Sequence, residues 1–324
     1  MKNNNYYNKI SYVFIKFSRK LSSLFSFMKN LKYKLFIIGI CFLICIITFN
    51  LGVFLFSSYN SSNENNTLVY FFNVDQGDSI LIKNPKFNIL IDSGSNKSSK
   101  YLINYLKSLH IKTFDYVIAT HPHEDHIGAM DDIINNFNIK NFIAPKVQAK
   151  EIDFTNMINS LYKNDLKINT VYDNKIIKLS NNNFLTFIWS GNSKDTNINN
   201  HSIAVKYDCN NISFLFTGDL ESNVEAQLIN NLSKGMNKNM LNSDVLKVAH
   251  HGSNTSSTLQ FLNSVNPKIS IISCGMGNDY GHPHKDTISN LKSINSKIYR
   301  TDFNGTIILK TDGNNIWLNK EYEF

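Results

Sequence analysis

The 324 residues suffice for one large domain with its own core, and an apolar content of 42 % excludes a chain that is disordered throughout. The net charge of +8 comes from residues 1–34, which hold eight of the 33 basic residues and no acidic one. The remaining 25 basic residues balance the 25 acidic ones. The pI of 9.1 therefore reflects the basic tail at residues 1–34. It gives little support to a nucleic-acid-binding surface on the rest of the chain.

An uncharged apolar run of 22 residues, 35–56, follows this basic tail directly. A transmembrane helix needs about 20 such residues, whereas the apolar part of a secretory signal has roughly 7 to 15. We therefore predict one uncleaved membrane span, with a buried core helix as the less favoured alternative. Because positive charge stays in the cytoplasm, residues 1–34 are expected inside the cell membrane and the C-terminal bulk outside it. Residues 57–66 are small and polar and predict a linker, and residues 67–324 predict one packed domain.

Four cysteines are present, and none of them forms a CxxC pair, which excludes a zinc ribbon. Cys41 and Cys45 lie within the apolar run, while Cys209 and Cys274 lie far apart in the domain. A disulfide between the latter two is permitted outside the cell. Two isolated buried thiols are the favoured interpretation.

Strands and helices alternate along the domain, as the periodicity of its apolar residues indicates. The expected elements are, in chain order, strands at 68–74, 79–83 and 87–91, a helix over 102–109, a strand at 116–119, a helix near 133–137, a strand and helix within 141–162, strands between 168 and 216, a helix at 221–232, a strand at 245–249, a helix at 258–265, a strand at 269–273, a helix at 285–294, and strands near 307 and 316. Two runs of strands, each accompanied by helices, predict a layered α/β sandwich.

Four side chains that can bind metal fall within six positions after the strand at 116–119: His121, His123, Asp125 and His126. Alternate residues of an extended segment point the same way, so the first two histidines can share one ion, and the last two residues can reach a second ion nearby. Imidazole and carboxylate ligands together suit zinc, manganese or iron. The alternative is a polar helix cap with incidental histidines, which this spacing disfavours.

Further candidates stand near other predicted strand ends. Asp219, in a Thr-Gly-Asp turn, has a carboxylate that could bridge two ions, and His250 follows the strand at 245–249. Asp92 follows the strand at 87–91 and could orient a ligand histidine from behind. A single aspartate in a turn usually stabilises the turn itself. These residues are candidates for a metal site only because the motif at 121–126 is also present.

The HxHxDH motif, the Thr-Gly-Asp turn and the segment 249–253 (AHHGS) resemble the metallo-β-lactamase superfamily. The domain resembles more closely the C-terminal hydrolase domain of the ComEC competence proteins, and the matching segments extend over roughly residues 67–320. These segments are 73–79 (NVDQGDS), 199–202 (NNHS), 246–253 (LKVAHHGS) and 280–284 (YGHPH). Two departures stand out: Asn73 and Asp75 replace an Asp and a Gly of the usual DVGQGD pattern, and this chain has a single candidate span where full ComEC proteins have a multi-span channel domain.

The resemblance implies a four-layer αββα sandwich with two divalent metal ions at the edge between its two sheets. The first two histidines of the motif would bind one ion, and Asp125, His126 and His250 the other. Asp219 would bridge the two ions. His201 is the only candidate, by its order along the chain, for a third histidine at the first ion. Zinc is the expected metal, with manganese as the alternative.

The same resemblance suggests residues for catalysis and for substrate. Asp125 would orient the nucleophile, and His251 would act in catalysis, contact the substrate, or support a metal-binding residue from behind. Ser253, together with His282 and His284, would contact a substrate phosphate. Histidines in a loop of Gly and Pro are otherwise ordinary surface residues.

The predicted function is that of a membrane-anchored hydrolase in which two metal ions activate a shared hydroxide. A phosphodiesterase or nuclease acting on DNA or on a phosphodiester of the cell envelope is the first interpretation. Hydrolysis of a carboxyl ester, lactone or lactam is the second, and a non-catalytic, membrane-tethered binding module is the third. The expected partner is the cell membrane, through residues 35–56, and nothing in the sequence indicates a protein partner.

Overall fold

The structure, a computed structural model, describes residues 15–23, 31–64, 66–191, 195–233 and 240–319. The chain divides into two compact units, residues 1–61 and residues 62–324. Most of the basic tail expected in the cytoplasm lies outside the described residues.

A long helix, α2 (Leu31–Glu64), makes up most of the described part of the N-terminal unit and is apolar on all sides along its middle. Its large apolar side chains, among them Phe42 and Phe49, are exposed. Within the part of the chain that the structure describes, no helix combines the length and the apolar character that crossing a membrane requires. The predicted span, 35–56, falls within α2, but the described side chains end at residue 51. The helix also continues through most of the stretch that the sequence predicts as a linker.

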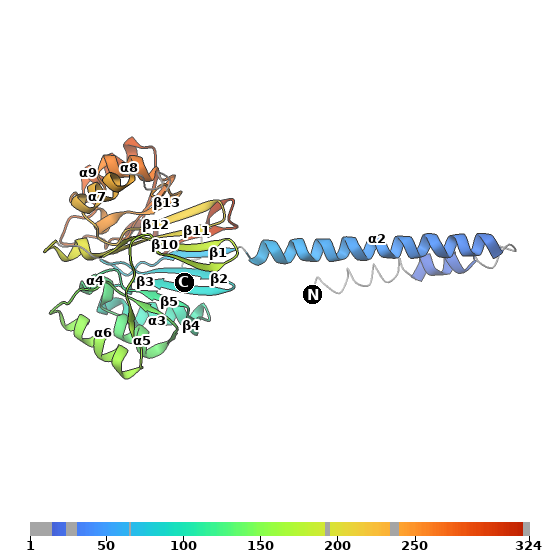
Figure 1. Ribbon diagram of the computed structural model, residues 1–324, viewed down its shortest axis with the longest axis horizontal. Helices are drawn as coiled ribbons and strands as arrows, with labels where there is room; N and C mark the ends of the chain where they lie inside the picture. The colour runs from blue at the N-terminus through green and yellow to red at the C-terminus, as the bar shows by residue number, and fades with distance from the viewer. Residues whose placement is uncertain (1–14, 24–30, 65, 192–194, 234–239, 320–324) are drawn as a thin grey trace. The chain divides into compact units, whose positions relative to one another are not determined.

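The second unit contains two mixed β-sheets, as the sequence predicts for an α/β fold (Figure 1). The first sheet has eight strands in the order β17-β16-β1-β2-β3-β5-β7-β8, among the described residues. Its strands are β1 (Thr67–Phe71), β2 (Ile80–Asn84), β3 (Phe87–Ile91), β5 (Tyr116–Ile118), β7 (Phe142–Ile143), β8 (Ile168–Asn169), β16 (Ile307–Thr311) and β17 (Ile316–Asn319). Neighbours are antiparallel from β17 to β3 and parallel from β3 to β8.

The second sheet repeats this arrangement with seven described strands in the order β15-β14-β13-β12-β11-β10-β9. Its strands are β9 (Ile176–Ser180), β10 (Asn183–Ser190), β11 (Ile203–Cys209), β12 (Ile212–Phe216), β13 (Val245–Lys247), β14 (Ile269–Ile272) and β15 (Lys297–Arg300). The strands β9 to β12 pair antiparallel, and β12 to β15 pair parallel. A separate pair joins β4 (Thr113–Phe114) to β6 (Asn138–Ile139).

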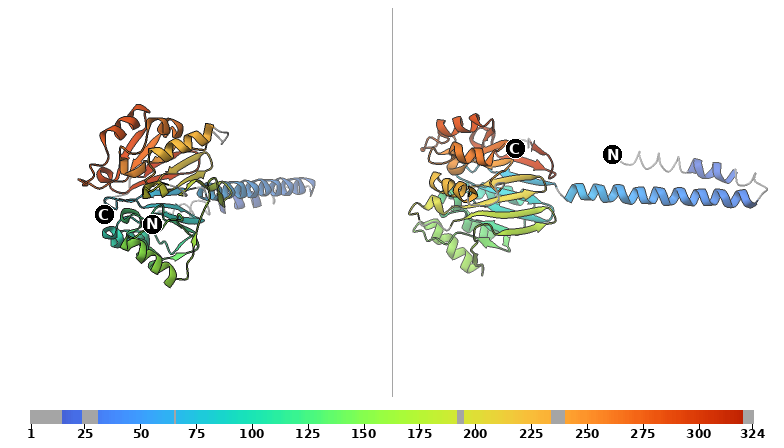
Figure 2. Two further views of the ribbon diagram at one scale, coloured as in Figure 1. Left: turned by 60° about the vertical axis from the view of Figure 1, so that its left-hand side comes forward. Right: turned by 45° about the horizontal axis from the view of Figure 1, so that its top comes forward.

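Helices cover the outer face of each sheet. The first sheet carries α3 (Ser99–Ser108), α4 (Glu124–Ile127), α5 (Met130–Asn136) and α6 (Ile152–Lys163), and the second carries α7 (Ser222–Ser233), α8 (Leu259–Val265) and α9 (Lys285–Ser293). Figure 1 shows these two groups on opposite sides of the strands, and both views of Figure 2 keep them apart. A short helix, α10 (Thr301–Asn304), follows β15.

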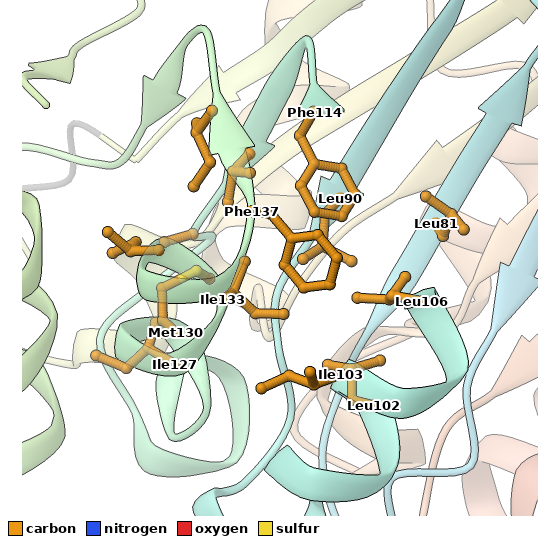
Figure 3. Close-up of a cluster of buried hydrophobic side chains, with 14 of the residues drawn as sticks. Leu81, Leu90, Leu102, Ile103, Leu106, Phe114, Ile127, Met130, Ile133 and Phe137 are labelled. Atoms are coloured by element: carbon orange, nitrogen blue, oxygen red, sulfur yellow. The ribbon is translucent and has the colours of Figure 1, made fainter. Parts of the chain in front are cut away.

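Three clusters of buried side chains fill the spaces between these layers. One lies between α3, α5 and the first sheet, where Leu106, Met130, Ile133 and Phe137 meet strand residues such as Leu90 (Figure 3). A second cluster lies between the two sheets, and a third lies under α7, α8 and α9. Burial of each large apolar side chain stabilises the folded state by about 1.5–3 kcal/mol. Together these side chains hold the strands, and therefore their ends, in fixed positions.

Candidate metal centre

The carboxyl ends of the parallel strands carry the metal-capable side chains. Asp92 follows β3, and the segment from His121 to His126 follows β5 in the first sheet. Asp219 follows β12, and His250 and His251 follow β13, in the second sheet. Loops at these ends meet outside the edge of an α/β sheet, where ligands commonly bind. The two sheets therefore supply side chains to one site.

The first group of possible ligands comes from His121, His123 and Asp219. His121 Nε2 lies 3.0 Å from His123 Nδ1 and 3.9 Å from Asp219 Oδ2. The ring of His121 is fixed on its other side, where Nδ1 lies 3.1 Å from the hydroxyl of Ser202. That hydroxyl also accepts a hydrogen bond from the Asp219 backbone N–H at 3.0 Å. Ser202 thus ties a ligand candidate from one sheet to a ligand candidate from the other.

The second group consists of Asp125, His126, Asp219 and His251, whose ligand atoms all lie within 4.8 Å of one another. Asp219 Oδ2 lies 3.3 Å from His126 Nε2 and 3.5 Å from His251 Nε2. His251 Nε2 also lies 3.1 Å from Asp125 Oδ2. The same Asp219 oxygen therefore faces both groups, as a bridging carboxylate would.

The buried polar atoms of this cluster fit a divalent cation. His126 Nε2, His251 Nε2 and Asp219 Oδ1 are buried, and among the described residues none makes a hydrogen bond of good geometry, although carboxylate oxygens lie 3.3 Å and 3.1 Å from the two nitrogens. Buried polar atoms in proteins are normally paired, and an ion is one of the few partners that accounts for several unpaired nitrogens and oxygens at one point. Nitrogen and carboxylate oxygen together suit zinc, manganese or iron.

The cluster also has the electrostatics of a cation site. Burial lowers the pKa of His126, but the carboxylates around it, Asp219 first, raise that pKa well above its ordinary value. Burial and the neighbouring His126 lower the pKa of His121 well below its ordinary value. Burial works against ionisation of Asp219, yet His126 and His251 hold the pKa of that carboxyl well below its usual range. Asp219 therefore stays ionised, and its negative charge draws positive charge to the site.

Contacts behind the cluster orient two of its histidines. His126 Nδ1 donates to Asp92 Oδ2 at 2.8 Å, and His251 Nδ1 donates to the carbonyl of Ser273 at 2.9 Å. Both bonds leave Nε2 free to face the centre, which is the usual way that a carboxylate or carbonyl fixes a ligand histidine. Asp92 is held in turn by Thr120, through its backbone N–H at 2.7 Å and its hydroxyl at 2.6 Å.

A buried ion pair that the sequence analysis missed lies behind the same two histidines. Lys247 Nζ lies 2.6 Å from Asp78 Oδ2, and the two side chains are 0 % and 1 % exposed. Asp78 Oδ1 lies 3.6 Å from His251 Nδ1, and Oδ2 lies 4.0 Å from His126 Nδ1. A lysine that ends a short buried strand was the available signal, since a buried ammonium requires a carboxylate nearby.

The adjacent residues His250 and His251 take different positions. Both have left-handed backbone, with φ of 50° and 53°, which costs non-glycine residues about 1–3 kcal/mol each and is typical of functional sites. His251 points into the second group, whereas His250 is partly exposed, with Nε2 3.8 Å from Asp219 Oδ2 and Nδ1 3.2 Å from the Thr255 hydroxyl. The structure thus brings His251 into the group where the sequence analysis placed His250.

His201 lies apart from the cluster. Its Nδ1 donates to the carbonyl of Gly191 at 3.1 Å, or its Nε2 to that of Asp195 at 3.0 Å. The next residue, Ser202, is the one that reaches His121. Since the ring of His201 faces backbone carbonyls, the geometry does not support it as a third ligand of the first ion.

A cavity of about 500 Å³ opens over the cluster. Asp125 and His251 line it from within, and His282 and Tyr280 line it from a loop of the second sheet. Burial and the neighbouring rings of His251 and His250 lower the pKa of His282 to about 4, so it is uncharged at neutral pH. A cavity of this size accommodates a nucleotide-sized ligand.

The other two residues expected to contact substrate lie outside the described lining of this cavity. Ser253 is buried, and its hydroxyl bonds to Thr255 Oγ1 at 3.0 Å. His284 Nδ1 accepts a hydrogen bond from the backbone N–H of Asn254 at 3.0 Å. Both residues therefore stabilise loops in this structure, and a direct role with substrate stays a prediction.

Two mixed sheets between helices, with histidines and aspartates gathered at the edge where the sheets meet, define a class of metal-binding α/β proteins. Residues 72–276 match the metallo-beta-lactamase superfamily, and the chain belongs to that superfamily. The resemblance noted from the motifs is thus confirmed.

The chain is related to competence proteins. It is 29 % identical to ComE operon protein 3 of Bacillus subtilis over 288 residues, which cover 83 % of this chain and 35 % of that protein. It is 25 % identical to competence protein ComA of Neisseria gonorrhoeae over 247 residues, which cover 75 % of this chain and 32 % of that protein. The chain thus spans about a third of the length of these relatives.

Solved structures show the same fold at low sequence identity. The metallo-beta-lactamase fold protein YhfI of Bacillus subtilis superposes with a TM-score of 0.50 at 12 % identity, over 76 % of this chain and all of that one. The CmlA beta-hydroxylase superposes with a TM-score of 0.51 at 8 % identity, over 76 % of this chain and 54 % of that one.

Proposed function

We propose that this protein is a metal-dependent phosphodiesterase whose first substrate class is nucleic acid. The observation that carries the proposal is the pair of adjoining ligand groups that share Asp219 beside an open cavity. The relation to proteins named for competence favours a phosphodiester over a lactam as the bond cleaved. Zinc fits the donor set, and manganese is the alternative.

The chain's own residues would hold the metal ions and position the substrate. The ions, when bound, would polarise the phosphoryl group and lower the pKa of water. His121 and His123 would hold the first ion, and Asp125, His126 and His251 the second, with Asp219 between them.

Asp125 has a second task in this proposal. Its side chain is 26 % exposed and lines the cavity, whereas His126, His251 and Asp219 are buried. Asp125 is therefore the carboxylate placed to accept a hydrogen bond from the attacking water and to orient it. Replacing Asp125 by an uncharged residue would therefore remove both a metal ligand and that hydrogen-bond acceptor.

The decisive experiment assays the purified full-length chain with added zinc or manganese. Single-stranded DNA and bis-p-nitrophenyl phosphate are the phosphodiesters, and a β-lactam is the comparison substrate. Asp125→Ala should lose metal and phosphodiesterase activity, whereas His110→Asn, an exposed residue away from the cavity, should retain both. Lactam hydrolysis without phosphodiester hydrolysis would refute the proposal, as would a chain that binds metal and cleaves none of the three.

We further propose that residues 35–56 anchor the protein in the cell membrane with the domain on the outer side. The support is the uncharged 22-residue run behind eight basic residues. The chain should stay with membranes after an alkaline wash, and protease added to intact cells should remove the domain. Recovery in the soluble fraction, or protection from protease, would count against the anchor or its orientation.

A further inference from the structure

Tyr280 is an exposed aromatic residue at the wall of the cavity. Its side chain is 66 % exposed, and it lines the cavity together with Asp125 and His251 of the metal centre. A single exposed aromatic residue is ordinary on a protein surface. Tyr280 differs because its ring stacks on His282, which lines the same cavity.

The loop that carries Tyr280 is tied to itself. The Asn278 side chain donates to the carbonyls of Gly275, at 2.9 Å, and His282, at 2.7 Å, and accepts from the His282 backbone N–H at 3.0 Å. The loop also packs tightly on the histidine segment, since a Cβ at Gly252 would come within 2.5 Å of the Pro283 side chain. The backbone that carries Tyr280 is thus held before any ligand arrives, which reduces the entropy lost on binding.

Three rings form a column that leads from solvent to the metal centre. The Tyr280 ring stacks on His282, with centroids 5.5 Å apart and planes at 20°. His282 stacks in turn on His251, with centroids 6.2 Å apart and planes at 26°. The inner face of Tyr280 is covered by His282, and the ring's exposure leaves the outer part for a ligand.

We infer that Tyr280 is a stacking platform for a base of the substrate next to the phosphodiester at the metal centre. This inference rests on the proposed function and specifies its substrate as single-stranded nucleic acid. A base stacks on an aromatic ring whatever its sequence. An acyl chain would instead require an apolar groove, and the lining of this cavity includes Asp75, Gln76 and Lys97.

The test compares two oligonucleotides on the full-length chain in manganese: an oligothymidylate and an oligomer of equal length whose bases are absent. Tyr280→Ala should raise KM for the oligothymidylate about 5- to 150-fold, the range expected for one lost stacking contact, and change kcat much less. Tyr280→Phe should restore the KM. Tyr162→Ala, a substitution of an 89 % exposed tyrosine on α6, is the matched control.

A binding measurement separates this inference from the proposed function. The same oligomers, labelled with fluorescein, are titrated by anisotropy with chains that also carry Asp125→Ala, so that cleavage does not interfere. A preference for bases that disappears with Tyr280→Ala supports the platform even if the wild-type chain cleaves no DNA. The inference is overturned if the chain with Tyr280 binds the two oligomers equally well, or if Tyr280→Ala weakens the binding of both oligomers equally. Either result overturns it even if bis-p-nitrophenyl phosphate is hydrolysed.

Discussion

Replacing Lys247 by methionine removes the charge that faces Asp78 while keeping a flexible side chain of similar length. Lys247 Nζ lies 2.6 Å from Asp78 Oδ2 and donates to the carbonyl of Val248 at 2.9 Å, and both charged side chains are shielded from water. Removing one partner of a buried pair costs about 3–5 kcal/mol, because the other charge stays buried without compensation. We therefore expect Lys247→Met to lower the free energy of unfolding by about this amount.

The assay is thermal and urea unfolding of residues 62–324, which form a separate compact unit, in the presence of a chelator so that metal binding does not contribute. Since 1 kcal/mol shifts the Tm of a domain of this size by about 2–4 °C, the single variant should lose roughly 6–20 °C. Lys310→Met, which removes a partly exposed lysine from β16 in the first sheet, is the control.

The double variant Lys247→Met with Asp78→Asn decides whether the pair is responsible. With both charges removed, most of the lost stability should return, because an uncharged replacement of a buried pair is often neutral. Losses that simply add, or a single variant that loses less than about 1 kcal/mol, would refute the argument.

Three other predictions concern the centre and a nearby thiol. Asp92→Asn should weaken metal affinity about 10- to 100-fold by loosening His126, and a titration against a chromophoric chelator would show whether it does. His251→Ala should reduce the metal content measured by elemental mass spectrometry, whereas His201→Ala should leave it unchanged. Loss of metal from His201→Ala but not from His251→Ala would indicate that His201 is a ligand and His251 is not. Burial raises the pKa of the Cys274 thiol to about 12, so at about pH 8 iodoacetamide should alkylate it only after unfolding, and labelling of the folded chain would contradict this.

The sequence predicted the fold class and most strand positions because periodicity and strand-end motifs are local signals. The expectation of two buried thiols in place of a disulfide is also confirmed, since Cys209 and Cys274 are buried and form no disulfide. The strand expected at 68–74 ends at Phe71, and the loop that follows places Asp75 and Gln76 in the lining of the cavity. Where a strand gives way to a functional loop depends on tertiary contacts that local patterns do not contain.

The choice between His250 and His251 shows more clearly what the sequence alone does not predict. Both residues follow β13, and regular backbone would point the two side chains in different directions. The left-handed conformation of both residues sets which ring faces Asp219. The next residue, Gly252, packs closely against Pro283 on a distant loop, and such long-range contacts leave no trace in the spacing of the histidines.

The place of Asp219 follows from the way the two sheets repeat one arrangement. Each sheet has an antiparallel part and a parallel part, and each brings the ends of its parallel strands to the same edge. The first sheet supplies the HxHxDH segment, and the second supplies Asp219 and His251. Neither sheet holds both ligand groups by itself, so a bound metal ion would connect the two sheets. Metal affinity and the packing between the sheets are therefore linked, because a ligand that binds only the assembled edge stabilises the folded state that forms it.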